Sequence, residues 1–295
     1  MSHAVLESSS VEGLLRDAAT RLQAAGVEQA RRDARLLLAA VLAVGTEAII
    51  ARPERRVAAE QAAAFESLVA RRAAREPVSR ILGRRGFWGL ELGIGPATLD
   101  PRPDSETLVE AVLEWWRSPA GPRCDRPPNI LDLGTGSGCL LLALLSELPR
   151  ALGLGLDRDP QALVMARDNA RALGLADRAC FAVGDWAEAI DGTWQAIVSN
   201  PPYIRGTEID ALEPEVAQYE PRSALDGGGD GLAAYRALAP QIARLLAPGG
   251  LAALEVGADQ ARDVTHLLTG AGLLSAGCRR DLSGHERCVL ATRDT

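Results

Sequence analysis

"NILDLGTGSGCLLLALLSEL", residues 129–148, contains two apolar runs joined by a glycine-rich turn. The first run is typical of a buried strand, and the second is long enough for a helix. Gly134, Gly136 and Gly138 allow a tight turn between them and let a ligand approach without interference from side chains. The stretch predicts a strand, a ligand-accessible turn and a helix.

The same alternation of strand and helix continues towards the C-terminus. Asp159 and Pro160 are a typical N-cap and first residue of the next helix. We expect further strands and helices in turn at 151–157, 160–174, 179–185, 195–200, 231–246, 251–256 and 259–272, and two final strands at 274–280 and 286–292. This order predicts an α/β fold with a doubly wound, mostly parallel sheet and right-handed crossovers.

Residues 10–80 have a different pattern, in which apolar residues recur every three or four positions. The pattern predicts a small bundle of helices. Gly26 and Gly45 are expected C-caps, and Pro77 is expected to stop the third helix. The predicted helices cover 11–26, 29–45 and 57–77.

The period changes after the bundle. Leu90, Leu92 and Ile94 alternate with small or polar residues, which predicts a β-hairpin within 87–99. A helix with Asp104 as its N-cap is expected at 101–116. We therefore divide the chain into a helical domain (1–84), a hairpin connector (85–100) and an α/β domain (101–295).

The charge of the chain is unevenly distributed. Its formal net charge is -7 over 295 residues, and every basic residue other than histidine is Arg. Residues 1–86 hold 14 Arg and 10 acidic residues, a balance of +4, whereas 87–295 hold 18 Arg and 29 acidic residues, a balance of -11. Binding to a nucleic-acid backbone requires clustered cations, so the acidic main body argues against a direct nucleic-acid partner.

The cysteines and apolar runs favour a cytoplasmic protein. Five cysteines without a C-x-x-C pair predict neither a disulfide framework nor a metal site, and fit a reducing compartment. The N-terminus lacks a basic region followed by an apolar core, so we expect no signal peptide. The longest early apolar run, 36–44, is about half of the ~20 residues needed to cross a bilayer, so we expect no membrane association.

Polar residues follow successive predicted strands. In doubly wound sheets, ligands bind beyond the carboxyl ends of the strands. Asp157 follows the second strand and could accept both hydroxyls of a ribose, although it could instead cap a helix. Asp185 could accept from an adenine amino group, and Trp186 could cover the ring or simply pack in the core. Together these residues predict a nucleoside-containing cofactor.

"NPPY", residues 200–203, ends the fourth strand at the same edge. The Asn200 side-chain oxygen and the Pro201 carbonyl could accept the two N–H groups of a planar amine or amide. Pro202 fixes the backbone, and Tyr203 offers a ring face to the planar group. Such a clamp fits an amide nitrogen that attacks a sulfonium methyl group. The alternative to a substrate clamp is a purely structural role, in which a strand ends in a rigid turn.

The chain resembles a known family of methyltransferases. "LDLGTGSG", "GLGLD", "GDW" and "SNPPY" are similar to class I S-adenosylmethionine-dependent methyltransferases of the N-P-P-Y type. The stretches 86–106, 219–236, "EVGADQ" and "RDLSGHERCVLA" resemble the peptide chain release factor glutamine methyltransferases, the PrmC/HemK family. The resemblance covers nearly the whole chain and is weakest over 1–75. Asp100 departs from the aliphatic residue usual in the family.

The resemblance implies a Rossmann-like sheet of seven strands with an N-terminal substrate-recognition domain. It implies N5-methylation of the glutamine in the Gly-Gly-Gln motif of class 1 release factors, with S-adenosyl-L-methionine as donor and S-adenosyl-L-homocysteine as product. We expect a monomer. The resemblance also implies the residues of the site. The implied cofactor-binding residues are Gly134, Thr135, Gly136, Ser137, Gly138, Asp157, Asp185, Trp186 and Asn200. The implied catalytic residues are Asn200, Pro201 and Tyr203, and the implied substrate-binding residues are Asn200, Pro201, Pro202, Tyr203, Phe87 and Arg102.

Other interpretations stay open at this point. An N6-adenine nucleic-acid methyltransferase could use the same clamp, and a ribosomal-protein glutamine methyltransferase is related in chemistry. A non-catalytic regulator could keep the cofactor pocket but would not need the Asn200 clamp. Phe87 and Arg102 could be scaffold residues, and the Arg-rich segment 71–85 could meet an acidic protein face or be a solvated helix face.

Overall fold

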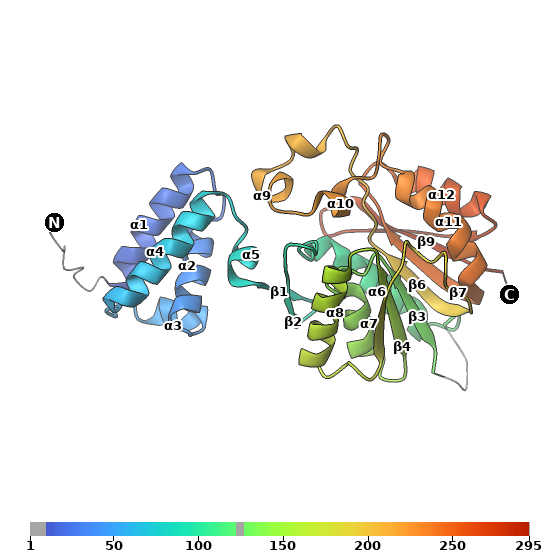
Figure 1. The fold of residues 1–295 in the computed structure, drawn as a ribbon, viewed down its shortest axis with the longest axis horizontal. Coiled ribbons are helices and arrows are strands. Elements are labelled where there is room, and N and C mark those ends of the chain that lie inside the picture. Colours follow the sequence, from blue (N-terminus) through green and yellow to red (C-terminus); the bar gives the residue numbers. More distant parts are fainter. Residues whose placement is uncertain (1–9, 122–126, 295) are drawn as a thin grey trace. The chain divides into compact units, whose positions relative to one another are not determined.

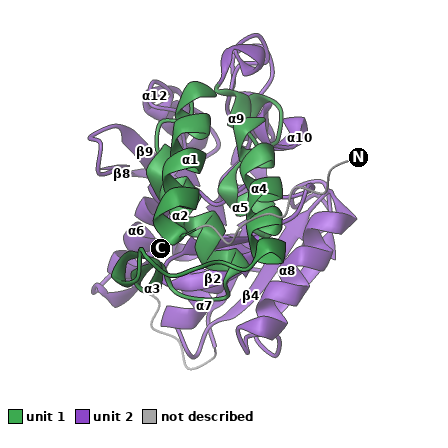
Figure 2. Ribbon diagram, turned by 90° about the vertical axis from the view of Figure 1, so that its left-hand side faces the viewer, with its two compact units in different colours: residues 1–83, 213–219 green, residues 84–212, 220–295 purple. Residues whose placement is uncertain are grey.

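The computed structural model describes residues 10–121 and 127–294. The chain forms two compact units (Figures 1 and 2). The first unit comprises residues 1–83 and 213–219, and the second comprises 84–212 and 220–295. Each unit has a hydrophobic core of its own.

The first unit is a helical bundle. Its amphipathic helices bury a shared apolar core that includes Leu22, Leu38 and Phe65, each 0% exposed. Ser10 caps the first helix by accepting a hydrogen bond from Gly13 N at 3.2 Å. The helices of this unit are α1 (Val11–Ala24), α2 (Ala30–Val41), α3 (Thr46–Ala51), α4 (Ala59–Ala73), α5 (Val78–Leu82) and α9 (Pro214–Ala217).

Ion pairs bind α9 to the rest of this bundle, although it lies far away in the sequence. Arg75 Nε donates to Glu215 Oε1 at 2.6 Å, and Arg72 Nη1 lies 2.9 Å from the same oxygen. Although burial acts in the opposite direction, hydrogen bonds from these two arginines lower the pKa of Glu215. Tyr219 adds a hydrogen bond from its hydroxyl to the Ala74 carbonyl at 2.8 Å. Arg72 and Arg75 of the Arg-rich segment are thus engaged within their own unit.

The second unit contains a sheet in the strand order β5-β4-β3-β6-β7-β9-β8. The first five strands in this order pair in parallel, and β9 pairs antiparallel with both β7 and β8. The strands are β3 (Asn129–Leu133), β4 (Leu152–Asp157), β5 (Ala179–Val183), β6 (Trp194–Ser199), β7 (Leu246–Glu255), β8 (Leu274–Arg280) and β9 (Glu286–Thr292). The predicted doubly wound, mostly parallel sheet is confirmed.

Helices cover both faces of this sheet (Figure 1). Successive residues of a strand point to opposite faces, so Ile130 packs with α6–α8 whereas Leu131 packs with α11 and α12. Shorter helical segments lie in the connections. The helical elements of this unit are η1 (Pro103–Ser105), α6 (Glu106–Arg117), α7 (Cys139–Glu147), α8 (Pro160–Ala172), η2 (Ile209–Ala211), α10 (Arg222–Leu225), α11 (Ala233–Leu245) and α12 (Ala261–Gly270).

Strand order reverses between β3 and β6, and this point positions the site. Chain connections leave β3 towards β4 on one side and return to β6 on the other. Leu133 and Ser199 are register partners at the ends of these strands, and the Ser199 hydroxyl donates to the Leu133 carbonyl at 2.6 Å. The connections that follow both strands therefore begin side by side, where doubly wound sheets bind ligands.

The hairpin begins earlier than the sequence pattern indicated. β1 (Arg84–Phe87) pairs with β2 (Leu90–Gly93), and residues 94–99 lie outside both strands. Trp88 and Gly89 form a two-residue turn with φ values of 51° and 71°. Positive φ at both central residues matches the twist of a hairpin, so this turn sets the pairing.

Three predicted helix boundaries were wrong. α2 ends at Val41, and Gly45 precedes the unpredicted helix α3 instead of capping α2. α4 ends at Ala73, before Pro77, which directly precedes α5. Asp104 lies inside η1, and Ser105 occupies the N-cap position of α6. The sequence pattern missed α3 and α5 and merged η1 with α6, because a single helical turn is too short to show a periodicity of its own.

Candidate active site

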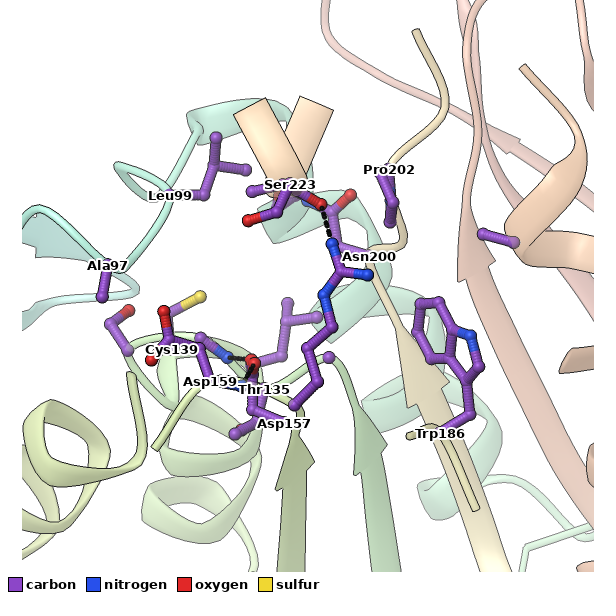
Figure 3. A pocket seen from close by; sticks show the side chains of 18 of the residues that line it. Ala97, Leu99, Thr135, Cys139, Asp157, Asp159, Trp186, Asn200, Pro202 and Ser223 are labelled. Atoms are coloured by element: carbon purple, nitrogen blue, oxygen red, sulfur yellow. Dashed lines mark hydrogen bonds between the residues drawn. The ribbon is translucent and has the colours of Figure 1, made fainter. Parts of the chain in front are cut away.

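A cavity of about 370 Å³ opens at the carboxyl ends of β3, β4, β5 and β6 (Figure 3). It lies entirely within the second unit. Among the residues proposed from sequence, those that line it are Gly134, Thr135, Gly136, Ser137, Asp157, Asp185, Trp186, Asn200, Pro202 and Arg102. The sheet thus brings together residues that are separated by up to about a hundred positions.

The glycine-rich turn forms one wall of the cavity. Gly134, Gly136 and Gly138 have φ values of +75°, +55° and +82°, which other residues adopt only with strain. The amides of Gly134 and Thr135 both donate to the Leu156 carbonyl at 2.9 Å, and this anchors the turn to β4. Gly138 does not line the cavity; it ends the turn at the start of α7.

Asp157 lies at the end of β4 and stabilises the glycine-rich turn by hydrogen bonding. Its Oδ2 accepts a hydrogen bond from Gly136 N, and its Oδ1 accepts one from Asp159 N, both at 2.9 Å. Each carboxylate oxygen has lone pairs to spare for a ligand hydroxyl. Asp159, and not Asp157, caps α8 by accepting from Gln161 N at 2.8 Å, as the sequence predicts.

Asp185 and Trp186 follow β5 and face the same cavity. Trp186 has a φ of +52°, and its ring also packs against the core between the sheet and α11–α12. A Cβ atom on Gly134 would lie 3.4 Å from this ring. The indole therefore packs against the core and also lines the cavity (Figure 3).

The Asn200 side chain enters the cavity from the end of β6 (Figure 3). Its Nδ2 donates a hydrogen bond to Ser105 Oγ at 3.3 Å. Pro201 is buried and does not line the cavity, whereas Pro202 does. The arrangement leaves Asn200 Oδ1 as an acceptor next to a backbone that two prolines hold rigid.

Tyr203 is turned away from the cavity lining. Its hydroxyl donates to Glu255 Oε1 at 3.3 Å, and its carbonyl accepts from Gln260 Nε2 at 2.9 Å. Burial and the nearby Glu255 carboxylate raise the pKa of the Tyr203 phenol, so this hydroxyl stays protonated at neutral pH. The ring packs at the edge of the core that α11 and α12 cover.

Phe87 and Arg102 have different surroundings. Phe87 is 2% exposed in the core with Leu92 and Leu108, so the structure favours the scaffold interpretation for this ring. Arg102 lines the cavity and donates to the buried Glu220 at 3.3 Å. Glu220 also accepts from Asp100 N at 3.1 Å, which ties the segment after the hairpin to the segment before α10.

Several residues that support the site were missed by sequence reasoning. Gly227 and Gly231 allow a close backbone approach, because a Cβ atom would lie 2.8 Å from Tyr203 Cα in the first case and 2.5 Å from the Tyr203 carbonyl oxygen in the second. Asn169 bridges the hairpin and the glycine-rich turn through Gly93 and Ser137. The run of glycines in "LDGGGDG" was the available signal, but nothing in it indicates the partner.

Two buried carboxyl groups lie beneath the cavity. Burial raises the pKa of Asp132 to about 7, although the hydrogen bond from Thr135 at 2.6 Å acts against it. Burial likewise raises the pKa of Glu255 to about 7, opposed by the Ser105 hydroxyl, the Arg287 guanidinium and the Tyr203 hydroxyl. Neither carboxyl group lines the cavity.

Solved structures with similar folds include methyltransferases. The hMettl16 catalytic domain, in complex with MAT2A 3′UTR hairpin 6, superimposes with a TM-score of 0.56 at 15% identity, covering 82% of this chain and 85% of that one. A methyltransferase from Pyrococcus furiosus gives 0.51 at 16% identity, with 71% and 92% covered. At these identities, the similarity shows the fold alone, and the fold is that of class I methyltransferases.

Sequence comparisons identify the family. The profile described as the PrmC N-terminal domain matches residues 13–83, and the one described as the methyltransferase small domain matches 123–230. A release factor glutamine methyltransferase from Rhodospirillum rubrum is 56% identical over 97% of this chain and 86% of its own length. One from Caulobacter vibrioides is 47% identical over 93% of both chains. The chain belongs to the release factor glutamine methyltransferase family.

Proposed function

We propose that this protein transfers a methyl group from S-adenosyl-L-methionine to the side-chain amide nitrogen of the glutamine in the Gly-Gly-Gln motif of class 1 peptide chain release factors. The observation that carries the proposal is the position of Asn200. Its amide enters the cavity at the switch point, beside the glycine-rich turn and Asp157. Relatives of the same family, with 40–56% identity, support the choice of substrate.

The cavity residues fit S-adenosyl-L-methionine. The positive-φ glycines leave the turn open to the methionine portion, Asp157 keeps acceptor capacity for ribose hydroxyls, and Asp185 and Trp186 provide an acceptor and a ring face for adenine. The bound cofactor supplies an electrophilic methyl group on a sulfonium. Thr135, Ser137 and Gly138 complete the turn.

Asn200 and Pro201 orient the glutamine amide. Asn200 Oδ1 and the Pro201 carbonyl accept its two N–H groups, so the nitrogen faces the methyl group, while Pro202 and Tyr203 keep both acceptors in place. The nitrogen is a weak nucleophile because its lone pair is delocalised. Its N–H groups become stronger donors as charge develops, so the two acceptors favour the transition state over the ground state.

The helical domain is proposed to recognise the release factor. Residues 1–84 would bind the release factor, residues 85–100 would connect the two domains, and residues 101–295 would carry out the methyl transfer. The separate core of the helical unit and its match to the PrmC N-terminal domain support this division. Arg102 at the cavity is a further candidate contact, and Phe87 would act by packing the hairpin.

The proposal also covers the oligomeric state of the protein, its contact with nucleic acid and its place in the cell. Within residues 10–121 and 127–294, no helix is both long and apolar enough to cross a bilayer. We infer a monomer that works in the cytoplasm without direct contact to nucleic acid. The acidic balance of the α/β domain supports the last point, because adenine methylation in a duplex would require a cationic surface.

Mass spectrometry after incubation with S-adenosylmethionine tests the function. A class 1 release factor should gain one methyl group on the glutamine of Gly-Gly-Gln, and a release factor with Asn at that position should gain none. Adenine-containing duplex DNA and ribosomal protein serve as competing substrates. Transfer to either of these but not to the release factor would overturn the proposed function.

A further inference from the structure

Asn169 is a buried side chain of α8 that forms hydrogen bonds to the backbone of two other segments. It is 4% exposed. Its Oδ1 accepts from Gly93 N at 2.7 Å, and its Nδ2 donates to the Gly93 carbonyl at 3.0 Å and to the Ser137 carbonyl at 2.8 Å. The Gly93 N–H can only donate, so it fixes which end of the amide carries the oxygen. The Asn169 side chain therefore has one defined orientation.

The contact with Gly93 fixes the start of a segment that lines the cavity. Gly93 is the last residue of β2, and residues 94–105 follow it directly. We call residues 94–105 the acceptor wall. The residues of the acceptor wall that line the cavity are Ala97, Leu99, Pro101, Arg102 and Ser105. Ser105 also accepts a hydrogen bond from Asn200 Nδ2 at 3.3 Å, so the acceptor wall reaches the proposed substrate clamp.

The contact with Ser137 fixes the glycine-rich turn on the other side of the cavity. Ser137 lines the cavity and directly follows Gly136, whose amide donates to Asp157 Oδ2 at 2.9 Å. Asn169 itself does not line the cavity. It therefore joins the glycine-rich turn to the start of the acceptor wall from outside the cavity.

A link of this kind makes the two sides of the cavity depend on each other. A ligand that immobilises the glycine-rich turn also restrains Gly93 through the hydrogen bonds of Asn169. The acceptor wall then has less conformational freedom to lose when a second ligand binds, so the second ligand binds more tightly. The effect is reciprocal, because each ligand must change the affinity for the other by the same factor.

We propose that Asn169 is a positioning residue that couples binding of the cofactor to binding of the release factor, because it holds the acceptor wall against the glycine-rich turn. This inference rests on the proposed function, in which the glycine-rich turn binds the cofactor and the acceptor side binds the glutamine. It extends the site to a residue that contacts neither ligand.

Asn169→Leu tests the coupling, because leucine is similar in size but forms no side-chain hydrogen bond. Calorimetry measures the affinity for a release factor with Asn in place of the Gly-Gly-Gln glutamine, with and without S-adenosylhomocysteine. In the wild type, S-adenosylhomocysteine should tighten release factor binding about fivefold or more, and in Asn169→Leu less than about twofold. An equal ratio in the two proteins would overturn the inference.

Arg167→Met is the matched control on the same helix. Arg167 Nη2 donates to the Phe181 carbonyl at 2.8 Å, so this side chain also links α8 to the backbone of another segment, but to β5. The variant should keep the wild-type ratio of affinities. A ratio lowered as far as in Asn169→Leu would mean that any loss of support for α8 has this effect, and would overturn the inference.

Gly93→Ala disturbs the same contact from the other side and serves where Asn169→Leu does not fold. Its Cβ would lie 3.0 Å from Met165 Sδ and 3.1 Å from Asn169 Oδ1, so both side chains must shift away from β2. The ratio of affinities should fall as in Asn169→Leu. Gly86→Ala on β1 is the control, because among the described residues no heavy atom beyond its chain neighbours lies within 4 Å of the added Cβ. A wild-type ratio in Gly93→Ala would overturn the inference.

A second readout does not need the release factor. Gly93 does not line the cavity, but its amide resonance should shift when S-adenosylhomocysteine binds the wild-type protein, because Asn169 links it to Ser137. The shift should be lost in Asn169→Leu and kept in Arg167→Met. No shift in the wild type, or an equal shift in Asn169→Leu, would overturn the inference. A shift in a wild-type protein that transfers no methyl to the release factor would overturn the proposed function alone.

Discussion

The proposed cofactor side and the proposed acceptor side of the cavity are built in different ways. The cofactor side comes from one continuous stretch, 131–186, whose turn is fixed by backbone amides and by Asp157. The acceptor side centres on 200–203 but is held by Ser105, Glu220, Gly227 and Glu255 from separate segments. Changes on the cofactor side should therefore act on affinity, and changes on the acceptor side on the rate of transfer.

The largest effect is expected for Asn200→Ala. Methyl transfer should fall by a factor on the order of 10² or more, because the contact that orients the nucleophile is lost. Cofactor affinity should stay nearly unchanged. Single-turnover assays would measure the rate of transfer, and calorimetry would measure cofactor affinity. Near wild-type transfer would mean that "NPPY" only ends a strand and has no part in the reaction.

On the cofactor side, Asp157→Ala should weaken S-adenosylmethionine binding by about 1–3 kcal/mol, or roughly 5- to 150-fold. The variant loses an acceptor for the ribose and also the support of Gly136 N. Asp168→Ala on the exposed face of α8 is the matched control, since its carboxylate pairs with Arg171 on the same helix. Unchanged affinity by calorimetry would remove Asp157 from the site.

The pH dependence of transfer probes the acceptor side without a mutation. Burial raises the pKa of Glu255 to about 7, so acidification from pH 8 to pH 6 converts most of this carboxylate to the neutral acid. The neutral acid is a weaker acceptor for the Tyr203 hydroxyl than the carboxylate, and transfer should fall about tenfold over this range. Glu255→Gln should show low transfer with no such step. A wild-type rate that is flat from pH 6 to 8 would contradict the prediction.

The smallest effect concerns the packing behind Tyr203. Gly227→Ala should lower transfer roughly threefold to tenfold, because its Cβ would lie 2.8 Å from Tyr203 Cα and displace the turn. Gly229→Ala is the matched control, because among the described residues no heavy atom beyond its chain neighbours lies within 4 Å of the added Cβ. Equal rates for the two variants would mean that the turn tolerates displacement. A loss of cofactor affinity in Gly227→Ala would contradict the expectation that changes on the acceptor side affect the rate of transfer and not the affinity.

The sequence by itself determined the alternation of strands and helices and the edge of the sheet at which the cavity opens. It also indicated the glycine-rich turn, Asp157 and Asn200, which line that cavity. These features depend on local physics: apolar periodicity selects the element type, glycine permits positive φ, and the ends of parallel strands meet at one edge. The same local signals failed for the short helices α3 and α5, because a single turn is too short to show a period.

Only the tertiary structure decided that Tyr203 donates to Glu255, that Asn200 donates to Ser105, and that Glu213–Tyr219 belongs to the helical unit. Each depends on a contact between segments that are 50 to 150 positions apart, and no local pattern records which partner a buried polar group will find. Burial of a carboxylate such as Glu255 destabilises the fold unless the charge is paired. The groups that lower its pKa, Tyr203, Ser105 and Arg287, come together only in the folded chain.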